Sequence, residues 1–265
     1  MDDSFEAGVS LPAGYVLHAH ACLPSTIDEA SRLAQEGAPS GTLVLAKEQT
    51  AGRGRRGNPW SSYAGNLHLS CVLRPRLSLS QMSCLSFVAS VAAGHAILPF
   101  LGNPSLLQYK WPNDILIDGF KVGGCVVDVG PSLASEDKPS WVVLSVGVNL
   151  CKAPHGMDYP VSCLKDLGLL VDGEAILSFF CTELQPLLKS VEDQGFETVR
   201  AMWMGRAWGM GETLSIDVGD GLVYQGVAEG ITAEGALLLK KYSGEKVTIP
   251  TGHVMRVPDK IDAGN

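Results

Sequence analysis

Apolar positions along the first two hundred residues recur with two different spacings. Short apolar runs bounded by Gly, Pro or polar clusters predict strands, whereas longer runs with helical spacing predict helices. The pattern predicts strands over 15–23, 42–47, 67–74, 106–110, 115–117, 121–129 and 141–150. It predicts helices from a T-x-x-E capping box at residue 26 to about residue 37, and over 81–101, 173–191 and 196–204. Strands and helices in blocks indicate an α+β fold with a mixed, largely antiparallel sheet flanked by helices.

The apolar spacing changes after residue 205, where glycines separate short apolar runs at 213–218, 223–229 and 236–241. Asp220-Gly221 between two of these runs is a hairpin-turn signal. We therefore predict two domains, 1–208 and 209–265, of which the second is a small β-barrel. A barrel of about 50 residues is close to the lower limit of independent stability, so it is expected to pack on the larger domain.

Composition limits which classes of protein and which cell compartments are compatible with this sequence. The 265 residues include 46% hydrophobic and 18% charged residues, and the formal net charge is −8. This composition excludes a disordered chain and disfavours a general binder of nucleic acid or anionic membranes. The acidic N-terminus lacks the features of a signal peptide, and no apolar run is long enough to span a membrane. Seven cysteines without a C-x-x-C spacing indicate reduced thiols, so we expect a cytoplasmic protein.

One segment concentrates positive charge in this acidic chain: GRGRRG at 52–57, within a Gly-rich loop over 49–66. Glycine allows the backbone to approach an anion, and arginine offers planar donor pairs to carboxylate or phosphate. The segment also fits G-x-G-x-x-G, but Asn58-Pro59 follows where a dinucleotide-binding fold needs a helix. A solvated basic loop and a nucleic-acid patch remain alternatives.

Further motifs are weaker individually. KWPND at 110–114 predicts a strand that ends in a turn, and KVGG at 121–124 places a lysine beside two glycines in a strand. An ordinary turn and a bulge are the plain alternatives. GVN at 147–149 ends an apolar strand, and helix capping alone can explain Ser25-Thr26. His18, His20 and Cys22 could ligate a metal, but a packed strand face is the favoured interpretation, and no metal site is predicted.

In this order, the motifs resemble the biotin–protein ligase family. The resemblance covers about residues 15–257, and its most specific parts are QTAGRGRRG followed by Trp60, and KWPND. It implies a catalytic domain like that of class II aminoacyl-tRNA synthetases, with an SH3-like C-terminal barrel. The implied activity is ATP-dependent biotinylation of a lysine on carboxylase carrier domains through biotinyl-5′-AMP, with Mg²⁺ on the phosphates. Ile27 departs from the family, which often has a short polar residue after Ser-Thr.

The resemblance also implies roles for individual residues. Catalytic roles fall on Lys121, Arg55, Asp114 and Lys110. Biotin would be bound by Ser25, Thr26, Gln49, Gly52, Arg53, Lys121, Gly123 and Gly124. ATP would be bound by Arg53, Arg55, Arg56, Trp60, Asn66, Lys110, Asn113 and Asn149. The apolar arm of biotin is expected against Trp60, Leu69 and the Gly123-Gly124 strand.

Three other functions are alternatives to this one. Lipoate–protein ligase shares the adenylate chemistry, but its Arg-Arg…Gly-Gly-Gly signature is not visible. A non-catalytic binding module has little use for Lys110, Asp114 and Lys121 together. A repressor would need a helix-turn-helix, and none is expected before Tyr15. We therefore expect biotin, ATP and carboxylase carrier domains as partners, without nucleic acid or membrane.

Overall fold

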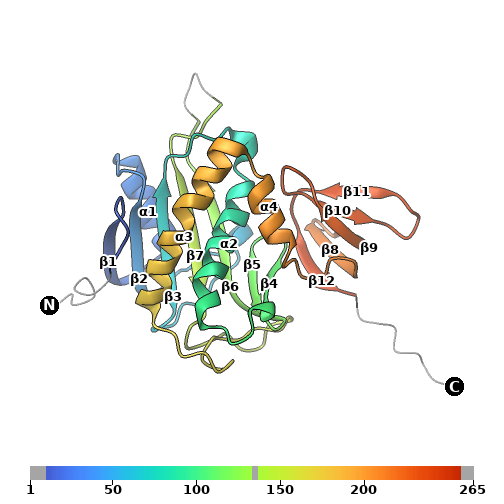
Figure 1. The fold of residues 1–265 in the computed structure, drawn as a ribbon, viewed down its shortest axis with the longest axis horizontal. Coiled ribbons are helices and arrows are strands. Elements are labelled where there is room, and N and C mark those ends of the chain that lie inside the picture. Colours follow the sequence, from blue (N-terminus) through green and yellow to red (C-terminus); the bar gives the residue numbers. More distant parts are fainter. Residues whose placement is uncertain (1–9, 133–136, 258–265) are drawn as a thin grey trace.

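The computed structural model describes residues 10–132 and 137–257 as a large sheet with flanking helices and a smaller sheet beside it (Figure 1). The acidic N-terminal segment and the end of the predicted C-terminal domain lie outside these residues. The large sheet has seven strands in the order β1-β2-β3-β7-β6-β5-β4. These are β1 (Val16–Leu23), β2 (Thr42–Gln49), β3 (Leu67–Leu73), β4 (Leu107–Lys110), β5 (Asp114–Ile117), β6 (Phe120–Val129) and β7 (Val142–Val148).

This sheet confirms the predicted mixed, largely antiparallel fold. β1 and β2 run parallel, and the other neighbouring strands run antiparallel. The helices are α1 (Thr26–Gln35), α2 (Cys84–Ile97), α3 (Gly173–Gln194) and α4 (Glu197–Met204), with 3-10 turns at Arg55–Gly57, Leu79–Gln81, Leu98–Phe100 and Pro104–Leu106. α2 is shorter than the predicted 81–101 because separate 3-10 turns precede and follow it; Ser78 and Gln81 close the first as a capping box.

The two faces of the sheet are covered unequally. α2 and α3 lie side by side across one face (Figure 1), and nearly every residue of α2 is buried there. On the other face α1 packs over β2, β3 and β7. Alternating residues of β7 show the division, since Leu144 and Val146 join the main core while Val143 packs under α1. α1 does not cover the part of this second face that β6, β5 and β4 form.

The C-terminal sheet follows α4 and packs against the larger unit, as predicted. Its strands β8 (Thr213–Gly219), β9 (Leu222–Ile231), β10 (Leu237–Lys240), β11 (Lys246–Ile249) and β12 (His253–Arg256) are ordered β11-β10-β9-β8-β12. Apolar side chains of these strands belong to the main core, and Trp111 donates a hydrogen bond to the Gly235 carbonyl at 2.9 Å. Among the described strands no pairing joins β11 to β12, so closure into a barrel stays a prediction. The boundary at 208 falls between α4 and β8 and also stays a prediction.

One expectation for β1 is wrong. His18 and Cys22 are exposed rather than part of a packed face. β1 is the edge strand, and α1 lies over its neighbours instead of over β1 itself. No group of three His, Cys, Asp or Glu side chains suited to a metal ion occurs within 10–132 and 137–257. The helices described are also too short or too polar to cross a bilayer.

Tyr109 couples the core to the open face. Its ring is fully buried against α2 and stacks on Trp203 at 6.3 Å between centroids. A Cβ added at Gly94 of α2 would lie 2.3 Å from the Tyr109 Oη and 2.7 Å from Cε1. Because side chains alternate along β4, burying Tyr109 directs the next residue, Lys110, to the opposite face.

We predict that Gly94→Ala destabilises the protein by about 1–3 kcal/mol, although alanine favours helix, because the buried Tyr109 ring must move. The measurement is the urea unfolding midpoint. Gly102→Ala is the matched control, since a Cβ at Gly102 meets open space. Equal midpoints for the two variants would contradict the proposed contact.

Candidate active site

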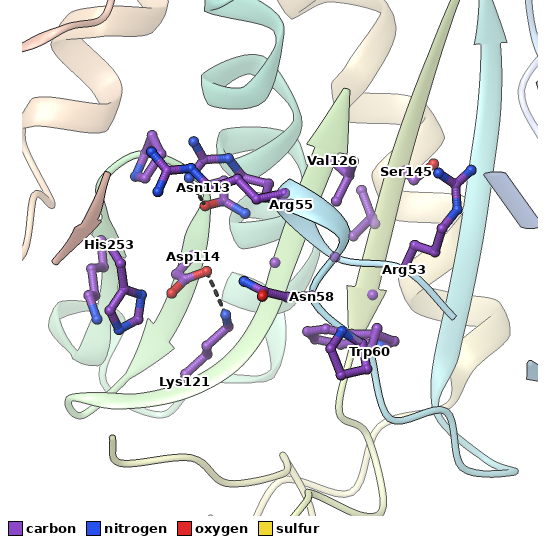
Figure 2. A pocket seen from close by; sticks show the side chains of 18 of the residues that line it. Arg53, Arg55, Asn58, Trp60, Asn113, Asp114, Lys121, Val126, Ser145 and His253 are labelled. Atoms are coloured by element: carbon purple, nitrogen blue, oxygen red, sulfur yellow. Dashed lines mark hydrogen bonds and ion pairs between the residues drawn. The ribbon is translucent and has the colours of Figure 1, made fainter. Parts of the chain in front are cut away.

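A cavity of about 570 Å³ occupies the face of the sheet that α1 leaves open. Its floor comes from β3, β5, β6 and β7, and the loop after β2 and the C-terminal sheet form its walls (Figure 2). Cationic side chains outnumber carboxylates in its lining: Arg53, Arg55, Arg56, Lys110 and Lys121 stand against Asp114 and Asp217. Such a lining suits an anionic ligand that supplies the missing negative charge.

The basic loop folds as a small hairpin over the cavity. The Trp60 amide donates to the Gly52 carbonyl at 2.9 Å, and the Gly54 amide donates to the Asn58 carbonyl at 2.7 Å. Arg56 turns the chain with a φ of 56°, in the left-handed region. A Cβ at Gly52 would lie 2.7 Å from the Trp60 carbonyl oxygen, so glycine permits the close crossing of the two arms.

Three arginines of this hairpin are held by different parts of the fold. Arg55 donates to the Asn113 side chain at 3.2 Å and to the Thr251 hydroxyl at 2.6 Å. Arg56 donates to the Val218 carbonyl at 3.1 Å, and Arg53 pairs with Asp28 of α1. The hairpin is therefore tied to both walls of the cavity, α1 on one side and the C-terminal sheet on the other.

The KWPND motif forms the turn between β4 and β5, as predicted. Lys110 and Asp114 are paired across the hairpin, and the Trp111-Pro112 peptide bond is cis. Asn113 clamps the turn to β6, since its side chain donates to the Cys125 carbonyl at 2.7 Å while its own carbonyl accepts from the Cys125 amide at 3.0 Å. The turn thereby fixes Asn113 as the acceptor that orients Arg55.

Lys121 and Asp114 form the central ion pair of the cavity, with Nζ 2.7 Å from Oδ1 (Figure 2). Both side chains are mostly buried, at 16% and 13% exposure. Burial lowers the pKa of Lys121, but the charge and hydrogen bond of Asp114 outweigh it, and the net result is a raised pKa. Lys121 therefore remains an ammonium group at neutral pH.

Lys110 has no such partner. It is 7% exposed and makes no salt bridge within the described residues. Burial, with a smaller contribution from Lys121, lowers the pKa of Lys110, and Asp114 opposes the shift. The rings of Trp208 and Tyr159 lie 5.4 and 5.7 Å from its Nζ. His253 of β12 borders the same region, and burial together with the two lysines lowers its pKa.

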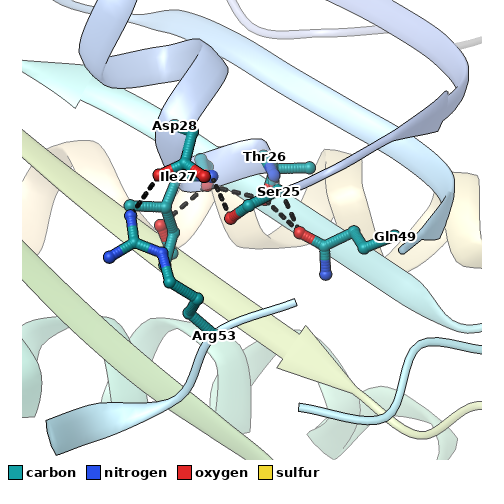
Figure 3. A network of polar contacts seen from close by, with 8 residues as sticks. Ser25, Thr26, Ile27, Asp28, Gln49 and Arg53 are labelled. Carbon is teal, nitrogen blue, oxygen red and sulfur yellow. Dashed lines mark hydrogen bonds and ion pairs between the residues drawn. The ribbon is translucent and has the colours of Figure 1, made fainter. Parts of the chain in front are cut away.

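Apart from the Arg53–Asp28 ion pair beside it, the opposite end of the cavity is polar and uncharged (Figure 3). Gln49 accepts from the Thr26 amide at 2.8 Å and from the Thr26 hydroxyl at 3.1 Å (Figure 3). The Gln49 amide donates to Ser62 at 2.9 Å, and Ser70 links Thr26 to Ser145 through contacts of 2.9 and 2.7 Å. This network can exchange donors and acceptors with a neutral polar ligand group.

Trp60 packs closely against the sheet at Gly147. A Cβ added there would be 2.7 Å from two atoms of the indole ring. The Trp60 Nε1 is buried without a partner among the described atoms, and the ring lies 5.9 Å from the Lys121 ammonium. Glycine at this point of β7 therefore lets an aromatic platform rest on the floor of the cavity.

The structure brings most of the predicted site residues into this one cavity. Those in the lining are Thr26, Gln49, Arg53, Arg55, Arg56, Trp60, Lys110, Asn113, Asp114, Lys121 and Gly124. Leu69 and Ile27, which the sequence placed beside the biotin arm and pocket, also line it.

Other predicted residues lie outside the lining and make contacts within the protein. Ser25 caps α1 by accepting from the Ile27 amide, and Asn66 accepts from the amides of 150–152 while lining a second cavity of about 230 Å³. The Asn149 side chain donates to the Ser162 carbonyl. Gly52 and Gly123 permit close backbone approaches, the latter to the Gly147 carbonyl.

Sequence reasoning missed several lining residues. Ser145, Val126 and His68 follow from strand alternation once the open face is known. Tyr159 and Met157 lie on an irregular segment. The C-terminal sheet adds further lining residues that belong to no motif recognised in the sequence. This last group is Asp217, Gly252, His253 and Val254.

Two family models match the chain. The Biotin/lipoate A/B protein ligase family matches residues 20–149, and the Biotin protein ligase C terminal domain matches residues 215–256. A biotin–[acetyl-CoA-carboxylase] ligase of Paracoccus denitrificans is 36% identical over 236 residues, covering 87% of this chain and 96% of that protein.

Solved structures of biotin protein ligases share the fold. The biotin protein ligase of Aquifex aeolicus, solved with biotin and ATP, aligns with a TM-score of 0.77 at 23% identity over 91% of this chain and 99% of that one. The Leishmania major enzyme, solved with biotinyl-5-AMP, aligns with a TM-score of 0.59 at 20% identity over 88% and 98%. With the 36% identity over nearly the whole Paracoccus protein, these matches establish that the chain belongs to the biotin protein ligase family.

Proposed function

We propose that this chain uses ATP to attach biotin to a lysine of a carboxylase carrier domain, through biotinyl-5′-AMP. The observation that carries the proposal is one cavity with a polar end, apolar side chains at Leu69, Val126 and Val146, and a cluster of buried cations. Biotin has the matching order of groups: a ureido ring, an apolar arm and a carboxylate. Membership of the ligase family and the solved relatives with biotin and ATP or biotinyl-5-AMP support the proposal.

In the first step, the biotin carboxylate attacks the α-phosphorus of ATP, and pyrophosphate leaves. Two anions must meet, so fixed positive charge lowers the barrier. Lys121 is assigned to the carboxylate and the forming anhydride, while Arg55 and Lys110 receive the phosphates. Mg²⁺ on the phosphates of ATP would supply further positive charge to this step.

In the second step, the acceptor lysine amine attacks the acyl carbon, the C–N bond forms and AMP leaves. The amine must be neutral to attack, and the nearby ammonium groups favour its deprotonated form. Asp114 is assigned to keep Lys121 in place during both steps. Arg53 and the backbone of the hairpin cover the anhydride and exclude water.

The polar end is assigned to the ureido ring. Thr26 and Gln49 offer the donors and acceptors, and Ser25 supports them by capping α1. Leu69 and the Gly123-Gly124 strand border the apolar arm, and Gly52 lets the hairpin close over it.

The nucleotide is assigned to the Trp60 side of the cavity. Trp60 would stack on adenine, with Arg56 and Asn113 toward the phosphates. Asn149 and Asn66 would act indirectly, because their side-chain hydrogen bonds hold the turn that follows β7 in place. We also propose residues 1–208 as the catalytic domain, 209–265 as a C-terminal domain, and the cytoplasm as the compartment, which the seven free cysteines favour.

ATP–pyrophosphate exchange with biotin or lipoate, followed by transfer to an apo carrier domain, tests the function. We expect exchange with biotin and a biotinylated carrier lysine. Exchange with lipoate alone would overturn the substrate assignment and favour a lipoate ligase.

Lys121→Ala is predicted to slow biotin-dependent exchange about 10²–10³-fold, because the forming anhydride loses its nearest fixed charge. Initial exchange rates at saturating ATP measure the effect. Lys189→Ala, which removes an exposed lysine of α3, is the control and should retain the wild-type rate. An unchanged exchange rate in Lys121→Ala would show that Lys121 has no role in the first step.

Gly147→Ala is predicted to raise the KM for ATP about tenfold, since the new Cβ must displace the stacking ring of Trp60. The KM for biotin should change less, because the Thr26–Gln49 end is untouched. Trp60→Phe retains a ring and should lose less ATP affinity than Trp60→Ala. A Gly147→Ala variant that raised only the KM for biotin would place adenine elsewhere.

A further inference from the structure

Two buried ammonium groups in the cavity share one carboxylate. Lys121 is paired with Asp114 at 2.7 Å, whereas Lys110 makes no salt bridge in the part of the chain described. A buried ammonium without a partner tends to lose its proton, and two of them also repel each other. Asp114 holds Lys121 charged, so something other than a second carboxylate is needed to stabilise the charge on Lys110 beside it.

Aromatic rings surround these two groups. The Tyr159 ring centroid lies 5.4 Å from the Lys121 Nζ and 5.7 Å from the Lys110 Nζ. Of the two ammonium groups, Trp60 faces Lys121, at 5.9 Å, and Trp208 faces Lys110, at 5.4 Å; Trp208 also faces Arg256, at 4.8 Å. Among the described rings, Tyr159 is the one that both ammonium groups share.

The backbone places Tyr159 beside Lys121 without help from the Tyr159 side chain. The Lys121 amide donates to the Pro160 carbonyl at 2.9 Å, and the Ser162 amide donates to the Lys121 carbonyl at 3.0 Å. Pro160 also restricts the preceding residue to an extended conformation. The segment thus lies along Lys121 like a short extra strand, so the ring can be changed while its position is kept.

We propose that Tyr159 is a positioning residue that holds Lys110 and Lys121 charged and facing the incoming phosphates. The proposal rests on the function proposed above. The negative face of an aromatic ring attracts an ammonium group without carrying formal charge. A carboxylate in the same place would repel both the triphosphate and the biotin carboxylate, whereas a ring stabilises the free cations and leaves them available to the anions.

Other charged and titratable groups act on these lysines and must stay constant in a test. Those whose charges act on Lys110, Lys121 or their neighbour His253 are Asp114, Cys125, Asp217, the two lysines themselves and, on Lys121, the Tyr159 hydroxyl. The variants below remove the Tyr159 hydroxyl and leave the other groups in place, and Tyr159→Phe isolates the contribution of the hydroxyl.

The first test compares Tyr159→Phe with Tyr159→Leu in biotin-dependent exchange. Phe retains the ring and should stay within about twofold of wild type. Leu should lose about tenfold in kcat/KM for ATP, with a smaller loss for biotin because Asp114 still holds Lys121. Losing the ring lowers the pKa of the ammonium groups, so the alkaline limb of the Leu profile should move to lower pH. Equal losses in Phe and Leu would assign the role to the hydroxyl and overturn the proposal.

The second test keeps the shape of the ring and weakens its attraction. Phenylalanine carrying one, three or five fluorine atoms at position 159 reduces the negative face of the ring in steps. The exchange rate should fall in the same order. An exchange rate that stays constant across the series would indicate that the ring serves only in packing, and it would overturn the proposal. This series also remains informative if the Leu variant does not fold.

The wild-type protein separates this proposal from the one on which it rests. Absence of biotin-dependent exchange in the wild type would refute the proposed function. Wild-type exchange together with unchanged rates and pH profiles in Leu and in the fluorinated series would refute only the role of Tyr159.

Discussion

Arg55, Lys110 and Lys121 meet in a partly buried cavity in which Asp114 pairs with only one of them. Removing cations from water is costly unless they are paired or hydrogen-bonded, so the fold has to compensate locally. It does so with neutral groups: the Asn113 and Thr251 side chains for Arg55, and aromatic rings for the lysines. The positive charge that remains is available to an anionic ligand.

The arrangement of layers explains how residues from distant segments reach this cavity. α1 covers only the β2, β3 and β7 part of its face, which leaves the ends of β4, β5 and β6 accessible. Burying Tyr109 against α2 turns Lys110 outward, and the bulge between β5 and β6 lies next to Lys121. The positions of both lysines therefore depend on a core on the other side of the sheet.

The sequence predicted the elements well where a pattern was local. The strands, the KWPND turn and the GRGRRG loop were recognisable because periodicity and turn residues act over a few positions. The exposed face of β1 was missed because its exposure depends on which strands α1 covers. Tyr159 and His253 were missed because only the tertiary fold brings residues 121, 159 and 253 together. Ser25 and Asn66 illustrate the converse: motif residues whose observed contacts support backbone rather than line the cavity.

The C-terminal sheet contributes to the cavity through β8, β12 and the loop that precedes β12. Thr251 fixes Arg55, and the Val218 carbonyl fixes Arg56, so both arginines of the hairpin tip depend on a separate unit. That unit shares the main core and accepts a hydrogen bond from Trp111, next to Lys110. The hairpin is rich in glycine, so these contacts restrict a backbone that would otherwise have greater conformational freedom. The small sheet thus serves as the fixed wall against which the basic hairpin is oriented.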